Sequence, residues 1–417
     1  MNKKKILVIS DNPLSVSGVG TQCRFLLNGL INTGRYTFRC LGAALKNASY
    51  ETLVPHPDFV IKPIDGFGDP NLIRQLLVSE KPDAVFLFTD PRFFSFFWQI
   101  EDEVHQFCPI VYWNIWDAPQ LPFDPDFNRY VYDSCDLLHC INYPTYEFVS
   151  GLFPERTHYT PHAVPKELYR PLPAHEVLPF KQRLLGQSRL DHFALLYVSR
   201  NARRKRTPDI LWAFKLFLDE LESKHGHRRA TMVMHTHPMD PEGTNLHAVV
   251  EKLGIKESVV FSQEQVRFED MALLYNSCDA LVNCSSAEGF GLGVLEMKMC
   301  GKPVIVLMTG GLSRQVKDHI TGEEYGVAMP VEVQSLVGTL NIPYITDDYN
   351  SVHSIAGAYM RMWEFGPEKR SEIGQRALAH AHRDYDMQHM VDSWDRTLWE
   401  TIENWRSRRK SWEKFEL

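Results

Sequence analysis

Short buried-strand patterns alternate with helical patterns along most of this chain. The strand patterns are rich in β-branched and aromatic residues, and the segments between them repeat apolar residues at helical spacing. Alternation of this kind predicts α/β architecture, with parallel sheets whose strands are joined by crossover helices. The predicted strands are Lys4–Ser10, Phe38–Gly42, Phe59–Ile61, Ala84–Thr89, Ile110–Asn114, Leu137–Ile141, His158–Pro161, Phe193–Ser199, Thr231–Thr236, Ser258–Phe261, Ala280–Cys284 and Pro303–Leu307.

A chain of 417 residues is too long for one such core and predicts two domains. The strand patterns fall into two series, and between them lies a segment, 165–187, with four prolines and no sheet pattern. We interpret that segment as part of a linker. The predicted organisation is a first domain over 1–168, a linker over 169–190, a second domain over 191–390 and a C-terminal helix over 391–417.

Composition restricts the class of protein. Hydrophobic content of 44% with 23% charged residues is typical of a globular protein, and a net charge of −7 gives no overall attraction to nucleic acid or anionic membrane. The eight cysteines form no C-x-x-C pair, which indicates a reducing, cytoplasmic compartment. No apolar run approaches the roughly 20 residues of a membrane span. The apolar run before Asp11 is too short for a signal peptide and predicts a first strand.

The stretch between the strand patterns Ala280–Cys284 and Pro303–Leu307 holds the strongest candidate site. Two carboxylates, Glu288 and Glu296, bracket a glycine-rich turn that leads into a helical pattern. Ligands of open α/β sheets bind beyond the carboxyl ends of the strands, and amides at a helix N-terminus favour phosphate. A solvated acidic loop is the alternative, but the bracketed arrangement favours a site. The glycine-rich turn between the two carboxylates comprises Gly289, Phe290, Gly291 and Leu292.

A cluster of cations follows the strand pattern Phe193–Ser199. Such a run is often a solvated face, but this one lies at the predicted ligand-binding edge of an acidic chain, where a diphosphate requires cations. We expect Arg200 and Lys205 to bind such a group, whereas the remaining members fit surface charge equally well. The cluster comprises Arg200, Arg203, Arg204, Lys205 and Arg206.

Three weaker signals lie in the first half of the chain. The loop with Gly18 and Gly20 follows the first strand pattern, but it lacks the third glycine and the acidic residue of a dinucleotide fingerprint, so NAD is not predicted. Asn114 and Asp117 follow another strand pattern; the neighbouring tryptophans, Trp113 and Trp116, fit a ligand face or the core. His162 follows a short strand pattern just before the linker, where a lone histidine is more often structural than a ligand. No His/Cys/Asp set has metal-ligand spacing, so no metal is predicted.

Taken together, these residues resemble the retaining glycosyltransferases of family 4. Glu288 and Glu296 stand in the E-x7-E arrangement of that family. Arg200 and Lys205 match the spacing of its G-R-L-x-x-x-K-G motif, although Ser199 replaces the glycine. The likeness also covers the Ser17–Gly20 loop, the PHAV segment around His162 and the MTGG segment at 308–311. It therefore spans most of the chain, with strong specificity in the second domain.

The resemblance implies a GT-B fold: two Rossmann-like, doubly wound domains facing a cleft, with the last helix crossing back to the first domain. It also implies a nucleotide-diphosphate-sugar donor, a UDP-sugar first of all, with no cofactor and no metal. The tryptophans of the last helix would then pack on the first domain. They are Trp394, Trp399, Trp405 and Trp412.

The resemblance further implies roles for the site residues. Arg200 and Lys205 would neutralise the diphosphate of the donor, Glu288 would bind the sugar, and Glu296 the ribose. Amides near Gly291 and Leu292 would contact sugar or phosphate, and the loop with Gly18 and Gly20 would close over the phosphates. The family's first-domain histidine is missing from the region 113–117, so Asn114 or Asp117 would take its contact with the sugar. His162 is assigned to the same donor site.

Three functions remain open at this point. The first is transfer of a sugar to a glycan, a lipid-linked glycan or a small molecule. The second is transfer to nucleic acid, such as hydroxymethylated bases of phage DNA, which the cation cluster at 203–206 permits and the net charge of −7 disfavours. The third is a non-catalytic protein that binds nucleotide or glycan, which the intact Glu288/Glu296 and Arg200/Lys205 pairs argue against.

Overall fold

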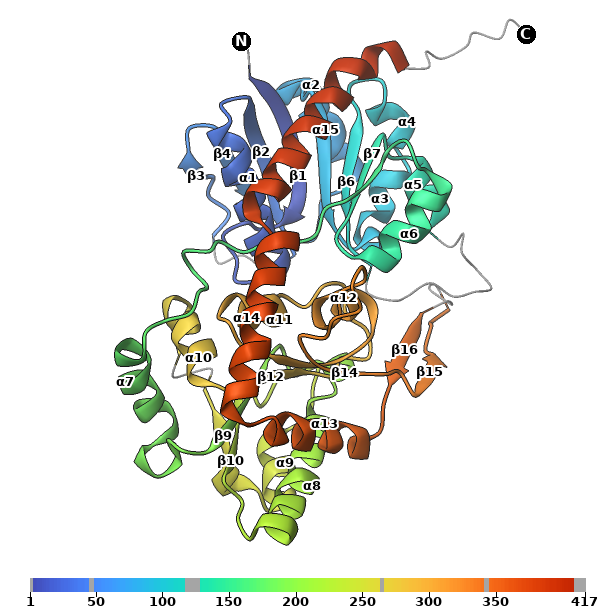
Figure 1. Ribbon diagram of the computed structural model, residues 1–417. Coiled ribbons are helices and arrows are strands. Elements are labelled where there is room, and N and C mark those ends of the chain that lie inside the picture. The colour runs from blue at the N-terminus through green and yellow to red at the C-terminus, as the bar shows by residue number, and fades with distance from the viewer. Residues whose placement is uncertain (1–2, 45–48, 117–127, 263–265, 341–344, 409–417) are drawn as a thin grey trace, which may run out of the picture. The chain divides into compact units, whose positions relative to one another are not determined.

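The computed structural model describes residues 3–44, 49–116, 128–262, 266–340 and 345–408. The chain divides into two compact units (Figure 1). The first unit is formed by described residues up to 163 and is completed by the helix that starts at 387, and the second is formed by 164–386. Both units contain a sheet of mainly parallel strands with helices between them, so the α/β prediction is confirmed.

The first unit is built on an eight-stranded sheet with the order β3-β4-β2-β1-β5-β6-β7-β8. All neighbouring strands are parallel except β3 and β4, which form an antiparallel pair at one edge. The strands are β1 (Lys4–Asp11), β2 (Tyr36–Ala43), β3 (Leu53–His56), β4 (Phe59–Pro63), β5 (Ala84–Thr89), β6 (Ile110–Asn114), β7 (Leu137–Cys140) and β8 (Thr157–Tyr159).

The helices of the first unit include α15, which comes from the far end of the chain. In Figure 1 it is the red helix beside α1, and it packs on α1 and β7. Trp394 is fully buried and stacks on His139 with ring centroids 3.8 Å apart. The helix therefore joins the first unit as predicted; Trp412 lies outside the described residues. The helices are α1 (Gly18–Asn32), α2 (Pro70–Glu80), α3 (Ser95–Trp98), α4 (Glu101–Val104), α5 (Arg129–Asp133), α6 (Tyr143–Leu152) and α15 (Met387–Arg408).

The second unit is built on a six-stranded parallel sheet with the order β11-β10-β9-β12-β13-β14, and a separate antiparallel hairpin pairs β15 with β16. The strands are β9 (Phe193–Val198), β10 (Ala230–His235), β11 (Val259–Phe261), β12 (Ala280–Asn283), β13 (Val304–Leu307), β14 (Gly326–Met329), β15 (Val333–Leu336) and β16 (Thr346–Tyr349). The helices are α7 (Ala174–Leu185), α8 (Thr207–His225), α9 (Leu246–Leu253), α10 (Met271–Ser277), α11 (Leu292–Met299), α12 (Ser313–Val316), α13 (Val352–Glu364) and α14 (Gly366–Asp384).

Some elements differ from the sequence prediction. The segment interpreted as a linker contains α7, a helix that packs on α10 within the second unit. Phe180, Leu184 and Leu185 form its buried face, and Pro179 lies inside it. Strands β3 and β14 and the β15–β16 hairpin were not predicted. β3 and β15 are largely exposed, so they lack the apolar run that marks the equally short buried strands β12 and β13. None of the helices in the described part of the chain has the length and apolar character needed to span a bilayer.

Candidate functional site

Two neighbouring strands of the second unit, β9 and β12, lead into the segments that carry the predicted cations and carboxylates. Lys205 lies in a short 3-10 helix, η3 (Arg203–Lys205), and its Nζ atom contacts Oε2 of Glu288. Arg204 donates to the backbone oxygen of Ala287 at 2.7 Å, and its Nη1 atom lies 4.0 Å from the same Glu288 oxygen. The side chains of Lys205 and Glu288 are only 8% and 12% exposed. Folding therefore brings together two residues that were predicted to share a site.

The charges around Glu288 keep its carboxylate ionised. Burial alone would raise the pKa of Glu288, but the nearby Lys205 and Arg204 charges and hydrogen bonds from Lys205 and Ser285 outweigh burial and lower it. Ser285 Oγ donates to Oε2 at 3.3 Å. An ionised carboxylate only accepts hydrogen bonds, so the lone pairs of Glu288 that these partners leave available suit hydroxyl groups of a ligand.

The glycine-rich turn after Glu288 lies against the segment that follows β13. Gly291 has a φ of +91°, a left-handed conformation that favours glycine, and a Cβ atom there would lie 2.4 Å from Cδ2 of Leu312. A Cβ atom on Gly311 would lie 2.3 Å from the oxygen of Gly289. The amide of Gly311 donates to the oxygen of Glu288 at 2.9 Å. The turn is therefore fixed by backbone packing directly before α11 begins at Leu292.

Glu296 lies on α11 and is held by two tyrosines. Tyr275 Oη donates to Oε2 of Glu296, and the Tyr169 hydroxyl is also hydrogen-bonded to that carboxylate. The rings of Tyr169 and Tyr275 lie 5.8 Å apart and pack edge to face. Burial raises the pKa of Glu296, and the two tyrosine hydrogen bonds partly oppose that rise. Neither tyrosine was predicted, because no sequence pattern links positions so far apart to Glu296.

Arg200 does not join Lys205 at Glu288 in this structure. Its Nε atom donates to Oδ2 of Asp240 at 2.8 Å and its Nη2 atom to Oδ1 at 3.2 Å. Its Nη1 atom lies 3.1 Å from the Glu242 carboxylate. The Arg200 side chain remains 57% exposed, so the prediction of a cation at this edge of the sheet is retained, but its partners are acidic side chains that the sequence analysis did not consider.

Arg206, assigned to surface charge as one alternative, is instead buried. It donates to Oδ1 of Asn350 at 3.0 Å and to the Asn350 backbone oxygen at 2.8 Å, and it pairs with Asp209. These bonds tie the start of α8 to the segment before α13. Together with Arg204 on Ala287, they give two members of the cation cluster structural roles.

In the first unit, Gly18 and Gly20 begin α1. Ser17 caps the helix, accepting from the Gly20 amide at 2.9 Å and donating to Asp11 at 2.7 Å. Burial raises the pKa of Asp11, and the bond from Ser17 opposes the rise. A Cβ atom on Gly20 would lie 2.4 Å from the oxygen of Asn12. Close packing inside the first unit therefore accounts for a glycine at position 20.

Two residues assigned to the donor site are enclosed in the first unit. Asn114 has no exposed surface, and its amide nitrogen lies 3.3 Å from Tyr132 Oη, so its burial leaves no face for a ligand. His162 is 4% exposed and packs edge-on against Trp113 at 4.8 Å. Burial lowers the pKa of His162 to about 3, which makes it neutral at physiological pH. Trp113 and Trp116 are buried, as the core alternative predicted, and Asp117 lies outside the described residues.

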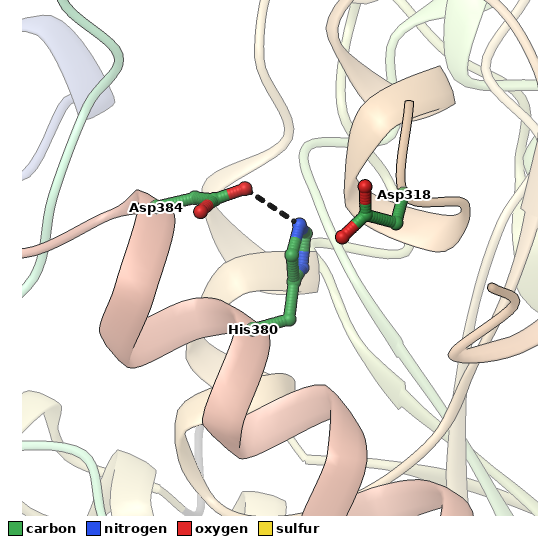
Figure 2. Close-up of side chains that lie close together, drawn as sticks. All are labelled: Asp318, His380 and Asp384. Atoms are coloured by element: carbon green, nitrogen blue, oxygen red, sulfur yellow. Dashed lines mark ion pairs between the residues drawn. The ribbon is translucent and has the colours of Figure 1, made fainter. Parts of the chain in front are cut away.

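A third polar cluster, which the sequence spacing did not reveal, lies behind α11. Figure 2 shows Asp318, His380 and Asp384, whose ligand-type atoms all lie within 4.8 Å of one another. Arg383 bonds to both carboxylates, reaching Asp318 at 2.6 Å, and Nζ of Lys298 bonds to Nδ1 of His380. Arg383 and Lys298 therefore already engage the atoms that a metal ion would need. We interpret the cluster as a hydrogen-bonded network.

Part of the chain matches a known family. Residues 185–337 match the family model described as glycosyl transferases group 1, and this segment contains Arg200, Lys205, Glu288 and Glu296. A D-inositol 3-phosphate glycosyltransferase of Mycobacterium sp. (strain KMS) is 41% identical over 78 residues. That alignment covers 19% of this chain and 18% of the relative, so the chain matches less than a fifth of the relative's length.

Solved structures are similar over nearly the whole chain. The Anabaena protein Alr3699/HepE, solved in complex with UDP and glucose, has a TM-score of 0.69 at 16% identity, with 95% of this chain and 100% of that chain covered. Sucrose-phosphate synthase from Thermosynechococcus elongatus has a TM-score of 0.72 at 14% identity, with 96% and 100% covered. At these identities the likeness shows the fold. It is the two-domain GT-B fold, as predicted.

Proposed function

We propose that this protein is a retaining glycosyltransferase that moves a sugar from a nucleoside-diphosphate sugar to an acceptor hydroxyl. The observation that carries the proposal is the shielded Lys205–Glu288 pair beside the glycine turn at the start of α11. It lies within the segment that matches the group 1 glycosyl transferases. A UDP-sugar is the first donor to test, because a protein of similar fold was solved with UDP.

Each residue of the second-unit site has a role in this proposal. Glu288, held ionised, accepts hydrogen bonds from hydroxyls of the transferred sugar. Lys205 and the amides of the turn stabilise the charge that develops on the departing diphosphate. Glu296, fixed by its tyrosines, accepts hydrogen bonds from the ribose hydroxyls.

Arg200 is the second cation for the diphosphate. It must exchange the carboxylates of Asp240 and Glu242 for the phosphate oxygens, which its exposure permits. Lys205, Arg200 and backbone amides together supply positive charge at the leaving group, so the proposed reaction does not require a metal ion.

The proposed step proceeds with retention on one face of the sugar. The bond from the anomeric carbon to the diphosphate oxygen breaks, and a bond from that carbon to the acceptor oxygen forms on the same face. The leaving phosphate takes the acceptor proton. The product is an α- or β-glycoside with the same configuration as the donor, which nuclear magnetic resonance of the anomeric proton distinguishes.

The acceptor class is a glycan, a lipid-linked glycan or a small molecule, and a phosphorylated polyol is the first to test because of the name of the similar relatives. Transfer to nucleic acid is a weaker alternative, since Arg204 and Arg206 of the cation cluster have internal bonds. The eight cysteines are buried free thiols, which supports a reducing, cytoplasmic location.

The test is a thermal-shift screen with UDP, GDP, ADP and their sugars, followed by product analysis. A ligand that binds the folded state raises the melting temperature, so the donor should stand out from its competitors. Turnover should be lost in Glu288→Gln and kept in Glu372→Gln, an exposed helix position used as a matched control. Stabilisation without turnover of any acceptor would favour the non-catalytic alternative, and no stabilisation by any nucleotide would refute the proposal.

A further inference from the structure

The glycine turn after Glu288 has three of its carbonyl groups held by one short segment, 310–315. The amide of Gly311 donates to the oxygen of Glu288 at 2.9 Å. The side-chain amide of Gln315 donates to the oxygen of Phe290 at 2.6 Å and to the oxygen of Gly291 at 3.2 Å. Gln315 is fully buried on α12. A single side chain therefore binds two successive carbonyl groups of the turn, and the oxygen of Gly291 also accepts from the amides of Val294 and Leu295 in α11.

Holding these carbonyls also sets the direction of the amides. In a trans peptide the C=O and N–H groups point to opposite sides, and the described residues contain no cis peptide bond. The N–H groups of Gly291 and Leu292, whose peptide carbonyls Gln315 holds, therefore face away from the 310–315 segment. Amides that converge at a turn before a helix form a concave site for an anion. The turn is thus preorganised for a phosphate group on the side opposite Gln315.

Gln315 is itself held by the polar network behind α11. Lys298, a fully buried residue of α11, donates through Nζ to the backbone oxygen of Gln315 at 2.8 Å and to Nδ1 of His380. Nε2 of His380 lies 3.0 Å from Oδ2 of Asp384, and the dashed line in Figure 2 marks this pair. The network therefore connects α11, α12 and α14.

Aromatic rings complete the support of the turn. The Nζ atom of Lys298 lies 4.9 Å from the ring centroid of Tyr325 and 5.4 Å from that of Tyr385. The ring of Phe290, from the turn itself, packs edge to face on Tyr385 at 5.7 Å. Burial lowers the pKa of Lys298 well below its usual value, which favours the neutral amine, and in that form Nζ still donates to Gln315 and His380. The turn is anchored to this network through both its backbone and its one aromatic side chain.

We propose that Gln315 is a positioning residue: it aims the turn amides at the diphosphate of the donor, and Lys298 and His380 hold it in place. This inference rests on the proposed function. Gln315 acts through its N–H groups, which no apolar side chain and no ionised carboxylate can supply. In Gln315→Glu the side chain repels the carbonyls of Phe290 and Gly291, and their peptide groups lose their fixed orientation.

The first measurement is amide hydrogen exchange of the ligand-free protein. In Gln315→Glu, peptides that cover residues 286–296 should exchange about tenfold faster than in the wild type, the change expected when one buried hydrogen bond is lost. Gln182→Glu is the matched control, because Gln182 is exposed and its side-chain amide donates to Gln187, which is also exposed. Gln315→Met, which removes the donors without adding charge, should behave like Gln315→Glu and serves if the charged variant does not fold.

The second measurement separates phosphate from nucleoside recognition. Affinity for UDP, or for GDP or ADP if one of these binds the wild type more tightly, should fall about tenfold or more in both Gln315 variants, as expected when hydrogen bonds to a charged group are lost. Affinity for the corresponding nucleoside without phosphate should not change. A general structural defect would weaken both.

The outcomes distinguish this inference from the function on which it rests. If the wild type binds none of the nucleoside diphosphates, the proposed function fails. If the wild type binds one and the Gln315 variants bind it equally well, the proposed role of Gln315 is wrong. Unchanged hydrogen exchange in both variants would also refute that role.

Discussion

Arg200 forms a two-point ion pair with Asp240, with its Nε and Nη2 atoms 2.8 and 3.2 Å from the two carboxylate oxygens. The pair lies at the surface, since the Arg200 side chain is 57% exposed. Exposed ion pairs contribute only about 0–1 kcal/mol to stability. Arg200 can therefore leave Asp240 for a more highly charged partner at little cost.

This exchange predicts opposite effects for the two residues. Asp240→Asn should tighten UDP binding by about twofold to fivefold at low salt, because the competing pair is worth less than about 1 kcal/mol. Arg200→Ala should lower kcat/KM by about 100-fold, because a cation at the leaving group is lost. Titration calorimetry and steady-state kinetics measure the two effects. Asp191→Asn is the control, because Asp191 forms an exposed ion pair with Arg229. Weaker binding in Asp240→Asn alone would contradict the exchange.

Lys205 and Glu288 should depend on each other for stability. Removing one partner of a shielded ion pair leaves an uncompensated charge, so Lys205→Met and Glu288→Leu should each destabilise the protein by about 3 kcal/mol. The double variant should lose less than the sum of the two single variants, and all three should lack activity. Urea unfolding followed by circular dichroism measures the free energies; strictly additive losses would show that the two charges do not interact.

Tyr275 should set the pH range of donor binding. Burial raises the pKa of Glu296 and the hydrogen bond from Tyr275 opposes that rise, so Tyr275→Phe should raise the pKa further. An acid with a higher pKa is protonated at higher pH, so the KM of the variant for the donor should increase more steeply than that of the wild type between pH 8 and pH 6. Tyr349→Phe, which removes a hydroxyl bonded to Asp347, is the control. Parallel pH profiles for Tyr275→Phe and wild type would argue against a ribose-binding carboxylate at 296.

His162 should make the first unit sensitive to acid. Burial lowers its pKa from 6.5 to about 3, so between these values the unfolded chain binds a proton that the folded chain does not. Stability therefore falls as the pH drops through this window, by about 2 kcal/mol between pH 6.5 and pH 5. His162→Phe, which keeps a ring against Trp113, should reduce the difference between urea midpoints at pH 7 and pH 5. The exposed His175→Gln should leave it unchanged.

Gly291 should not tolerate a side chain, because of close packing as well as its positive φ angle. In Gly291→Ala the new Cβ atom would lie 2.4 Å from Leu312, so the turn must move, and both activity and melting temperature should fall. Gly226 also has a positive φ, but a Cβ atom there would have no neighbour within 4 Å. Gly226→Ala should therefore cost only about 1 kcal/mol and preserve activity. Equal effects of the two substitutions in thermal unfolding and turnover would refute the packing argument.

The sequence predicts the parts of the site that depend on strand order. Adjacent parallel strands end at the same edge of a sheet, so Lys205 after β9 and Glu288 after β12 meet even though 83 positions separate them. No comparable rule predicts which side chains from distant loops will form a pair. Asp240 lies 40 positions from Arg200, and neither composition nor periodicity links them.

The direction of side chains was the second feature that could not be predicted from the sequence. Asn114 was predicted at the end of a strand with its side chain facing a ligand; it is the last residue of β6, paired with Cys140 of β7, but its side chain is enclosed. A shift of one residue reverses the face on which a strand side chain lies. Gln315 and Tyr275 were not predicted for a different reason. Each holds another residue of the site in place, and nothing in the sequence distinguishes such a glutamine or tyrosine from any other buried polar residue.

The position of α15 has a consequence for how the protein is made. The ribosome releases the strands of the first unit early, but Trp394, which covers Phe86 and His139, follows only after the second unit has been synthesised. The face of the sheet that α15 covers therefore stays exposed to solvent while residues 164–386 are synthesised and fold. An interrupted chain that ends before 387 would expose that apolar face permanently, which makes it a substrate for chaperones and proteases. Completion of the first unit therefore requires that residues 164–386 have already been synthesised.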